Sequence, residues 1–543
     1  MPLRHQPPSA PARPRPARTA RAASALRHGI LVASLCGLWH GTVAQAQVNL
    51  PALGDSVSSD FDLNDERKLG ERIMRSIRQD PDFLDDPLLS EYLRGLWLPL
   101  LDAARQRGDI DASTDASFPW ELFQVRDRSV NAFALPGGYV GVHLGLIAMT
   151  GSADELASVL AHELTHVTQR HIGRSMVNSQ RQSMASVAAM VLGLIVASRA
   201  GTMDGANAVI MGSQAAMAQG QLNFSREMER EADRIGLQLL STAGFVPAGM
   251  ASMFEKMESN SRLNDSNQYP YLRSHPLTIE RISEARLRTS NAGPGTRSPT
   301  PAEHGLMQAR ARVLMDNAEP TLRRLQTQAQ PGSPAMDSNR LAALYAGALA
   351  SLKLRDYPQA YQAIDAALTL AKARFGTEPR ARRALLLLKL ETQVAESRPT
   401  ESLSAALAPL GGDTARPTLL ARSQAALAWR RSGESAAAEP VLRQSVEALQ
   451  TWVTLHKQDV LAWQALSQCA EALGLRLRAL RSGAEAAAAS GDVVGAVDRF
   501  RIAQQIARED ANADYVEASI IQSRLRELEA ERRKLMAEMR NGG

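Results

Sequence analysis

His162-Glu163-Leu164-Thr165-His166 is the most informative stretch of this chain, and it lies within a helical pattern that covers 154–174. Residues at positions i and i+4 share one face of a helix, so both imidazoles can bind one metal ion from a single rigid element. Glu163 then lies beside the metal, where its carboxylate can take a proton from a bound water. The stretch therefore predicts a helix that carries a metal centre.

Zinc in hydrolases usually has three protein ligands and one position open to water, so a third ligand must come from elsewhere in the chain. The metzincin pattern is excluded, because Gln169 and Ile172 stand where it requires Gly and His. His171 follows His166 by five residues and is turned off the ligand face, which predicts a surface histidine. The carboxylates within 227–233, Glu-Met-Glu-Arg-Glu-Ala-Asp, are the alternative.

The first 46 residues have the features of a secretory signal peptide. Residues 1–28 contain six arginines and no acidic residue, 29–39 are apolar, and Ala44-Gln45-Ala46 is typical of a cleavage site. Eleven apolar residues are too few to span a bilayer, so we expect cleavage after Ala46 rather than a retained anchor.

Removing this leader changes the charge of the chain. The formal net charge is +5, and without the six arginines it is about −1. A near-neutral protein with 4% aromatic residues gives no support to nucleic-acid binding. Cys469 is the one cysteine left, so no intrachain disulfide is expected.

The rest of the N-terminal half predicts a domain over 47–290, whose start, 47–60, is polar and extended. The expected elements are helices over 64–106 and 224–243 and strands over 120–125 and 139–143. Pro99 is expected to kink or divide the first helical stretch. Leu135-Pro136-Gly137-Gly138 predicts a turn into the second strand, whose free edge could pair with an extended substrate or be purely structural.

Two apolar segments, 184–198 and 206–218, are each shorter than a membrane span. They predict core helices or a hairpin packed on the domain. The alternative is a flap that gates the substrate or makes peripheral membrane contact through 184–218.

A Gly- and Pro-rich stretch, 291–303, predicts a linker, and the composition then changes to Ala, Leu, Arg and Gln in helical periodicity. Within 304–518 we expect degenerate tetratricopeptide-like repeats, of which 460–493 is a 34-residue unit. Its signature positions are Trp463, Leu466, Ala479 and Ala486. Further units are expected near 341 and around 419–449, and a generic helical bundle is the alternative. The charged segment 519–543 predicts a solvated terminal helix.

Three motifs together resemble the HtpX and CAAX-prenyl-protease class of zinc metallopeptidases. They are 156–171, the Glu-x-x-Ala-Asp that ends at Asp233, and the upstream Asn-Ala-Phe-Ala-Leu-Pro-Gly-Gly of 131–138. The resemblance extends over about 62–287, and the leader and repeats make the chain similar to a soluble periplasmic branch of that class.

The resemblance implies one zinc ion per chain, bound by His162, His166 and Glu229. Asp233 lies one helical turn after Glu229, where it can accept a hydrogen bond from a ligand histidine's other ring nitrogen. Glu227 and Glu231 are then expected to face solvent.

His275, in Ser-His-Pro-Leu, is a further candidate, because relatives that this chain resembles also have a His-Pro segment after the ligand helix. We expect His275 to reach the site, either as an oxyanion donor or as a fourth ligand that displaces water and silences the enzyme. The alternative is a loop histidine that caps the next helix.

The fold expected from these observations is mainly α: a zincin-like metalloprotease domain of helices plus a small β-sheet, followed by the helical repeat domain. The leading function is a periplasmic zinc endopeptidase of a Gram-negative bacterium. The resemblance implies that its partners are misfolded or stalled outer-membrane proteins and, through the repeats, their assembly machinery. The alternative is a repeat-based chaperone or scaffold with a latent site; a hydrolase of small peptides is disfavoured by the large repeat region.

Overall fold

The computed structural model describes residues 61–178, 225–263, 268–290, 292–297, 299–330, 337–376, 378–398, 400–510 and 512–541. The predicted leader, the stretch 47–60 and the apolar segments within 184–218 lie outside these residues. Among the helices of the described ranges, none is both long and apolar enough to cross a bilayer.

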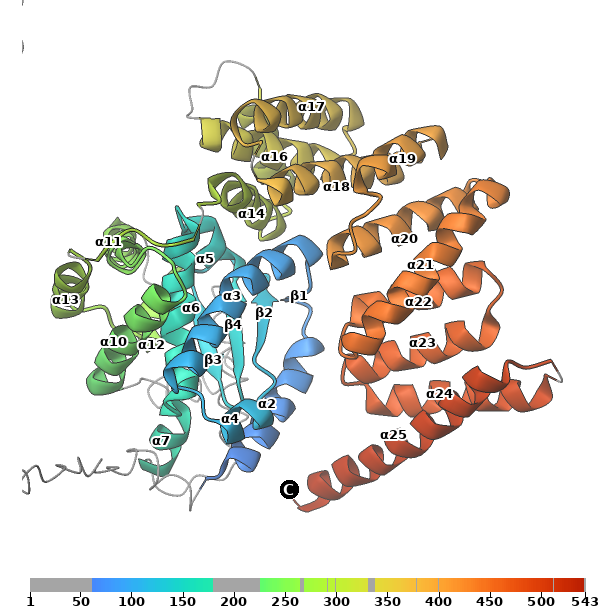
Figure 1. The fold of residues 1–543 in the computed structure, drawn as a ribbon, viewed down its shortest axis with the longest axis horizontal. Coiled ribbons are helices and arrows are strands. Elements are labelled where there is room, and N and C mark those ends of the chain that lie inside the picture. Colours follow the sequence, from blue (N-terminus) through green and yellow to red (C-terminus); the bar gives the residue numbers. More distant parts are fainter. Residues whose placement is uncertain are drawn as a thin grey trace, which may run out of the picture. The chain divides into compact units, whose positions relative to one another are not determined.

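A four-stranded sheet forms the frame of the N-terminal part (Figure 1). Its strands are β1 (Phe83–Leu84), β2 (Glu121–Val125), β3 (Ala132–Leu135) and β4 (Tyr139–His143). Their order is β1-β2-β4-β3; β2 and β4 are parallel, and the two outer strands are antiparallel to their neighbours. The two predicted strands are thus present, whereas β1 and β3 were not predicted.

The connection between β3 and β4 is the predicted turn. Gly137 and Gly138 have φ of +78° and +88°, a region that side-chain-bearing residues rarely adopt. This turn pairs β3 antiparallel to β4, while β2 pairs with the other edge of β4. The free edge expected for Tyr139–His143 is therefore wrong: β4 is an interior strand, and β3 is the outer strand on that side.

Alternate residues of the strands enter two different apolar clusters, as the two-residue period of a strand requires. Val140 and Val142 of β4 pack with helices α3 and α6, whereas Tyr139 packs on the other face with α2. The helices of this part are α2 (Leu63–Arg78), α3 (Pro87–Arg107), α4 (Ala112–Ser117), α5 (Leu144–Met149), α6 (Ala153–Thr168), α7 (His171–Asn178), α10 (Arg226–Thr242), α11 (Ala248–Leu263), α12 (Pro270–Ser274) and α13 (Ile279–Thr289).

Two helix predictions need correction. The helical stretch expected over 64–106 is two helices: α2 ends before β1, and α3 begins after it. Helix α3 continues undivided through Pro99, and the residues on either side of this proline, Leu96 and Leu100, are buried. The single helix expected over 154–174 ends at Thr168, and α7 starts at His171. Arg170, between them, has a φ of +50°, which breaks the helical path.

The C-terminal part is helical throughout its described residues, and Figure 1 shows its last helices stacked from orange to red. The helices are α14 (Pro301–Leu314), α15 (Glu319–Gln328), α16 (Asp337–Lys353), α17 (Tyr357–Arg374), α18 (Pro379–Ala395), α19 (Thr400–Leu407), the 3-10 helix η2 (Ala408–Leu410), α20 (Arg416–Arg431), α21 (Ser435–Leu455), α22 (Val460–Ala472), α23 (Arg476–Ala489), α24 (Val493–Glu509) and α25 (Tyr515–Asn541).

The unit predicted over 460–493 contains α22 and α23, which pack against each other. Its four signature positions are buried, and Ala479 and Ala486 leave room for close approach of the helices. Terminal helix α25 is not simply solvated, since Ile521 and Leu525 are buried against α24 and the buried Glu517 is paired with Arg481 of α23. The assignment to tetratricopeptide repeats and the domain boundaries stay predictions.

Three arginines of the C-terminal helices bind acidic residues at the start of α3. The pairs are Arg310 with Asp86, Arg383 with Glu91 and Arg416 with Asp85. The first pair is buried and bidentate, with both nitrogen–oxygen distances 2.7 Å. One apolar cluster also includes residues of both parts, for example Leu160 of α6 and Leu306 of α14. The two parts are therefore joined by charge pairs and by shared core.

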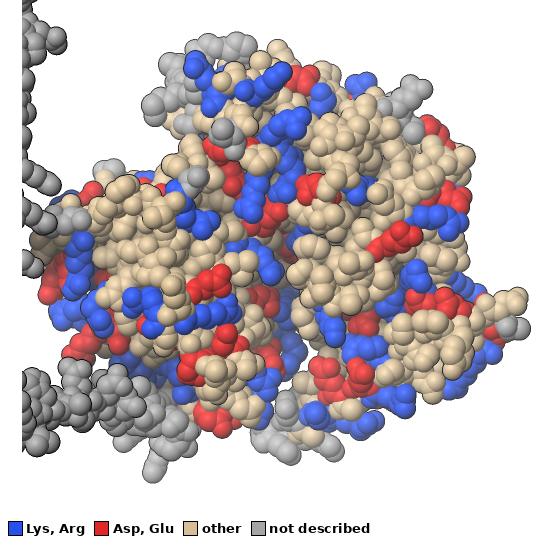
Figure 2. Space-filling model, in the orientation of Figure 1, with Lys and Arg blue, Asp and Glu red and all other residues tan. Residues whose placement is uncertain are grey.

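Basic and acidic side chains are interspersed on the face of the molecule that Figure 2 shows. The expectation that the chain does not bind nucleic acid rests on its composition and stays a prediction.

Candidate metal centre

Helix α6 supplies the two histidines of the motif. Its N-terminus is capped by Ser152, whose side chain accepts a hydrogen bond from the backbone N–H of Glu155. The Glu155 carboxylate in turn accepts hydrogen bonds from Ser252 and Lys256 of α11, which fixes the helix against its neighbour. His162 and His166 are both buried, and their Nε2 atoms lie 3.0 Å apart, as expected for histidines one turn apart.

Helix α10 supplies two carboxylates, and its close approach to α6 depends on a glycine. A Cβ on Gly236 would lie 3.2 Å from the backbone nitrogen of His162 and 3.3 Å from the backbone of Ala161. Glu229 is buried, and its carboxylate oxygens lie 3.6 Å from His162 Nε2 and 3.5 Å from His166 Nε2. The structure thus brings together the two histidines and the glutamate that the sequence analysis named.

His275 lies at the end of α12 and also points into this centre. Its Nδ1 is 2.9 Å from a Glu229 oxygen and 3.4 Å from His162 Nε2, and its Nε2 is 3.5 Å from a Glu163 oxygen. The interpretation as a helix cap is wrong, because Thr278 caps α13. One atom from each of His162, His166, Glu229 and His275 lies within 4.8 Å of the others.

These four residues fit a zinc ion by their chemistry and burial. Imidazole nitrogens and a carboxylate are the donors that zinc prefers. Glu163 is fully buried, and within the described residues neither of its carboxylate oxygens has a hydrogen-bond partner, although one lies 3.5 Å from His275 Nε2. Burying a carboxylate without hydrogen bonds is costly, so its retention beside the four donors fits a carboxylate that acts on a water at the metal.

The electrostatics of the centre also favour a cation. Burial lowers the pKa of His162, but its contacts with Asp233 and Glu229 outweigh burial and raise that pKa to about 9. Burial, together with the charge of His162, lowers the pKa of His166 well below its usual value. Burial favours the neutral form of Glu229, yet His275 and His162 hold its pKa well below the usual range. The carboxylates thus hold a proton on one imidazole, at the place where a metal ion would bind.

Asp233 lies next to His162, with its Oδ1 3.0 Å from His162 Nδ1. Arg281 of α13, which the sequence analysis missed, holds both acidic residues of α10. Its Nε and Nη2 donate to Asp233 at 2.6 and 2.7 Å, and its Nη1 is 2.8 Å from Glu229. Nothing in the local spacing links Arg281 to α10, so only the tertiary fold identifies it.

The expectation for His171 is wrong, because this histidine is buried. Its Nδ1 lies 2.9 Å from His166 Nδ1, and its Nε2 lies 3.1 Å from the carboxylate of Glu231. Glu231 also accepts a hydrogen bond from Arg174 and is not simply solvent-facing, whereas Glu227 is exposed as expected. The cause is the break in the helix at Arg170, which turns the side chain of His171 back toward the ring of His166.

Tyr271 is a second residue that the sequence analysis missed. Its ring stacks on His275 at a centroid distance of 4.6 Å, and its buried hydroxyl has no hydrogen-bond partner within the described part of the chain. Burial, followed by the charge of Glu163, raises the pKa of Tyr271 well above its usual value. Tyr271 therefore keeps its proton and can donate it in a hydrogen bond.

Comparison with known families and proteins places these residues among peptidases. Residues 104–289, which include every residue of the centre, match the model of peptidase family M48. A putative beta-barrel assembly-enhancing protease of Vibrio cholerae is 37% identical over 267 residues, which cover 49% of this chain and 52% of that protein.

Two further relatives come from Escherichia coli. Its beta-barrel assembly-enhancing protease is 32% identical over 273 residues, 50% of this chain and 54% of that protein. Its metalloprotease LoiP is 32% identical over 174 residues, 32% of this chain and 64% of that protein. The matched region spans about half the length of the two assembly-enhancing proteases.

Proposed function

Because residues 104–289 match the model of peptidase family M48, we propose that this chain is a zinc-dependent endopeptidase. The observation that carries the proposal is the convergence of His162, His166 and Glu229 beside the buried carboxylate of Glu163, which has no hydrogen bond among the described residues. A structural zinc site would have no use for such a carboxylate, whereas a hydrolytic site needs one.

His162, His166 and Glu229 would hold the zinc ion, which when bound lowers the pKa of a water toward neutrality and polarises the scissile carbonyl. Glu163 takes the proton of the attacking water on a carboxylate oxygen and then passes it to the leaving amine. Asp233 lies 3.0 Å from His162 Nδ1, where it would accept a hydrogen bond from the Nδ1–H and leave Nε2 free to bind metal. Arg281 fixes both α10 carboxylates for these tasks.

For His275 we propose the second of its two roles, a fourth ligand that silences the site. Its Nδ1 lies 2.9 Å from a Glu229 oxygen, and it belongs to the same group of possible metal ligands as His162, His166 and Glu229. Turnover then requires the loop after α12 to move His275 aside. Tyr271, whose buried hydroxyl has no hydrogen-bond partner among the described residues, is the candidate that would stabilise the oxyanion in the opened site.

The wider role rests on what the relatives are named for and on the predicted leader. We propose that the chain is exported to the periplasm of a Gram-negative bacterium, where it cleaves misfolded or stalled outer-membrane proteins. The C-terminal helices would hold these proteins or contact their assembly machinery. The two assembly-enhancing proteases match about half of this chain, and this similarity supports the proposed role.

Degradation of an unfolded β-barrel protein by zinc-loaded residues 47–543 tests the proposal. We expect cleavage by the wild type and, in Glu163→Gln, a loss of about 10²–10⁴-fold in turnover with one zinc still bound per chain. Glu227→Gln is the matched control, because Glu227 is an exposed glutamate near the same centre. Equal cleavage by Glu163→Gln and the wild type would overturn the proposal.

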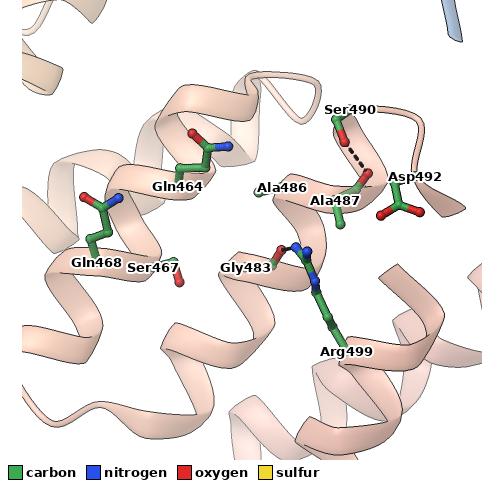
Figure 3. A pocket seen from close by; sticks show the side chains of 9 residues that line it. All are labelled: Gln464, Ser467, Gln468, Gly483, Ala486, Ala487, Ser490, Asp492 and Arg499. Carbon is green, nitrogen blue, oxygen red and sulfur yellow. Dashed lines mark hydrogen bonds between the residues drawn. The ribbon is translucent and has the colours of Figure 1, made fainter. Parts of the chain in front are cut away.

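The alternative function, a chaperone or scaffold, has an observation of its own. A pocket of about 310 Å³ lies between α22, α23 and the start of α24 (Figure 3). It is lined by the small residues Gly483 and Ala487 and by polar side chains such as Gln464, Gln468 and Arg499, whose guanidinium donates to the Gly483 carbonyl. Amide side chains beside small residues suit the backbone of an extended polypeptide.

Binding of the same unfolded β-barrel protein to Glu163→Gln measures this second function without cleavage. We expect Gln468→Ala combined with Arg499→Ala to weaken binding, while Gln505→Ala, a change of an amide outside the pocket, leaves it unchanged. If the wild type cleaves nothing but binds through the pocket, the chaperone function becomes the better one.

A further inference from the structure

We propose that His171 is a positioning residue that, together with Glu231, fixes the orientation and tautomer of the metal ligand His166. The proposal rests on the zinc centre of the proposed function. It concerns a contact that lies behind the ligands, on the side of His166 that faces away from Glu229 and His275.

The contact is made by three side chains in series. His166 Nδ1 lies 2.9 Å from His171 Nδ1, and the two rings are inclined at 75° with their centroids 4.8 Å apart. His171 Nε2 lies 3.1 Å from an oxygen of Glu231. Arg174 donates to the same Glu231 oxygen at 2.9 Å, which holds the carboxylate in place.

The positions of the protons follow from this geometry. His166 directs Nε2 toward the other ligands, so a metal there leaves the proton on Nδ1. That Nδ1–H can donate only to an unprotonated nitrogen, so His171 must carry its own proton on Nε2. The Nε2–H of His171 then donates to Glu231, a carboxylate that can only accept. One arrangement of protons satisfies all three groups.

The two ligand histidines are thereby supported in different ways. Asp233 contacts His162 Nδ1 directly at 3.0 Å, whereas the carboxylate of Glu231 reaches His166 through the intervening imidazole of His171. Such partners of metal-bound histidines fix the ring and raise its basicity, and their loss typically weakens metal binding 10–100-fold. The break at Arg170 gives His171 this position, because a continuous helix would turn it away.

Zinc affinity of the full mature chain, measured by competition with a chromophoric chelator, tests the proposal. We expect His171→Phe, which keeps a buried ring but no acceptor, to weaken zinc binding by about 10–100-fold. His171→Asn keeps an acceptor near the Nδ1 position and should recover part of that loss. Glu231→Gln should weaken binding less than His171→Phe, and the exposed Glu227→Gln should not weaken it.

Nitrogen-15 spectra of the histidine rings in the zinc-loaded protein supply a readout that a purely structural role would not move. We expect the proton of His166 on Nδ1 and that of His171 on Nε2. Zinc affinity within twofold of the wild type in His171→Phe, or the opposite tautomer of His171, would overturn the proposal. If His171→Phe does not fold, the zinc affinities of His171→Asn and Glu231→Gln decide: values for both within twofold of the wild type would overturn the proposal.

Failure of this proposal is distinguishable from failure of the proposed function. Zinc affinity is measured without turnover. A wild type that binds zinc but cleaves no protein would therefore disprove the endopeptidase function and leave the role of His171 intact. A wild type that binds no zinc would disprove both proposals.

Discussion

At the scale of single residues, the centre combines donors that converge on one point with groups that hold those donors in place. His275 belongs to the first kind, and it contacts both Glu229 and Glu163. Arg281 belongs to the second kind, because one guanidinium binds two carboxylates of α10. Substitution of either residue should lower zinc affinity, but only the loss of His275 should also raise the rate of cleavage.

His275→Ala is expected to raise peptide cleavage by about tenfold or more, because it removes a group that competes with water for the fourth position. Zinc affinity should fall at the same time, since one donor is lost. Cleavage of a quenched-fluorescent peptide and chelator competition measure the two effects. An unchanged rate together with unchanged zinc affinity would disprove a role for His275 in the site.

Arg281→Lys is expected to lower zinc affinity by about 10–100-fold, although the charge is retained. A lysine ammonium is a point charge and cannot bind Asp233 bidentately while it also reaches Glu229. Arg230→Lys, at an exposed arginine that pairs with Glu280, is the matched control and should have no effect. The idea fails if the two variants bind zinc equally well.

At the scale of elements, the centre depends on how closely two helices approach. Helix α10 carries Glu229 and Asp233, and Gly236 lies where this helix contacts the backbone of α6. The space left for a Cβ at that position is tighter than ordinary van der Waals contact, with three backbone atoms at 3.2–3.3 Å. A larger side chain must push the helices apart and separate the ligands that each one carries.

Gly236→Val is accordingly expected to weaken zinc binding by about tenfold or more and to destabilise the fold by about 1–3 kcal/mol. Arg234→Val introduces the same β-branched side chain at an exposed position of α10 and controls for helix propensity. Chelator competition and urea unfolding give the two values. Equal zinc affinities in both variants would show that the approach of the helices does not set the ligand geometry.

The elements also explain how much could be predicted from the sequence. His162 and His166 are related by one helical turn, so local spacing was enough to name them, whereas Glu229 was named only as what the family resemblance implies. His171 was misplaced because periodicity assumes a continuous helix, whereas Arg170 adopts a positive φ that few non-glycine residues adopt. Strand β3 was missed because four residues, two of them alanine, give little strand signal.

Tertiary contacts account for what remained beyond prediction. Arg281 lies 48 residues after Asp233 along the chain. Tyr271 reaches the centre because its helix, α12, packs beside His162. The free edge of 139–143 was wrong for the same reason, since pairing on both sides of β4 depends on a strand that was not predicted. The sequence therefore indicated the ligands and Asp233, whereas Arg281 and Tyr271 are identified from the fold.

At the scale of the whole molecule, the first turn of α3 joins the sheet-containing part to the C-terminal helices. Asp86 caps α3 and is bound by Arg310, whose guanidinium also donates to the hydroxyl of Tyr345. Burial raises the pKa of Asp86, but the charge and hydrogen bonds of Arg310 outweigh it, and the pKa is lowered. The lowered pKa means that the pair stabilises the fold while Asp86 is ionised.

Asp86→Asn is expected to lower the free energy of unfolding by about 3–5 kcal/mol at pH 7, because it leaves a buried arginine without its charge partner. A depressed folded-state pKa contributes stability above the unfolded value of about 3.9, and this is lost as the pH falls toward the folded value. The difference from the wild type should therefore shrink below about pH 4.

Asp102→Asn, at an exposed position of the same helix, is the control and should cost less than about 1 kcal/mol. Urea unfolding at several pH values measures all three proteins. A difference between Asp86→Asn and the wild type that stays constant as the pH falls would contradict the pairing argument.

The apolar cluster that contains both Leu160 and Leu306 has a practical consequence. A protease that nicks the chain between 291 and 303 would cut one covalent connection but leave the shared core and the arginine pairs of α3 in place. The two fragments should then elute together from a sizing column and separate only in denaturant. Limited digestion would thus leave two fragments that stay bound noncovalently. The isolated N-terminal fragment would expose to solvent apolar surface that is buried in the intact protein.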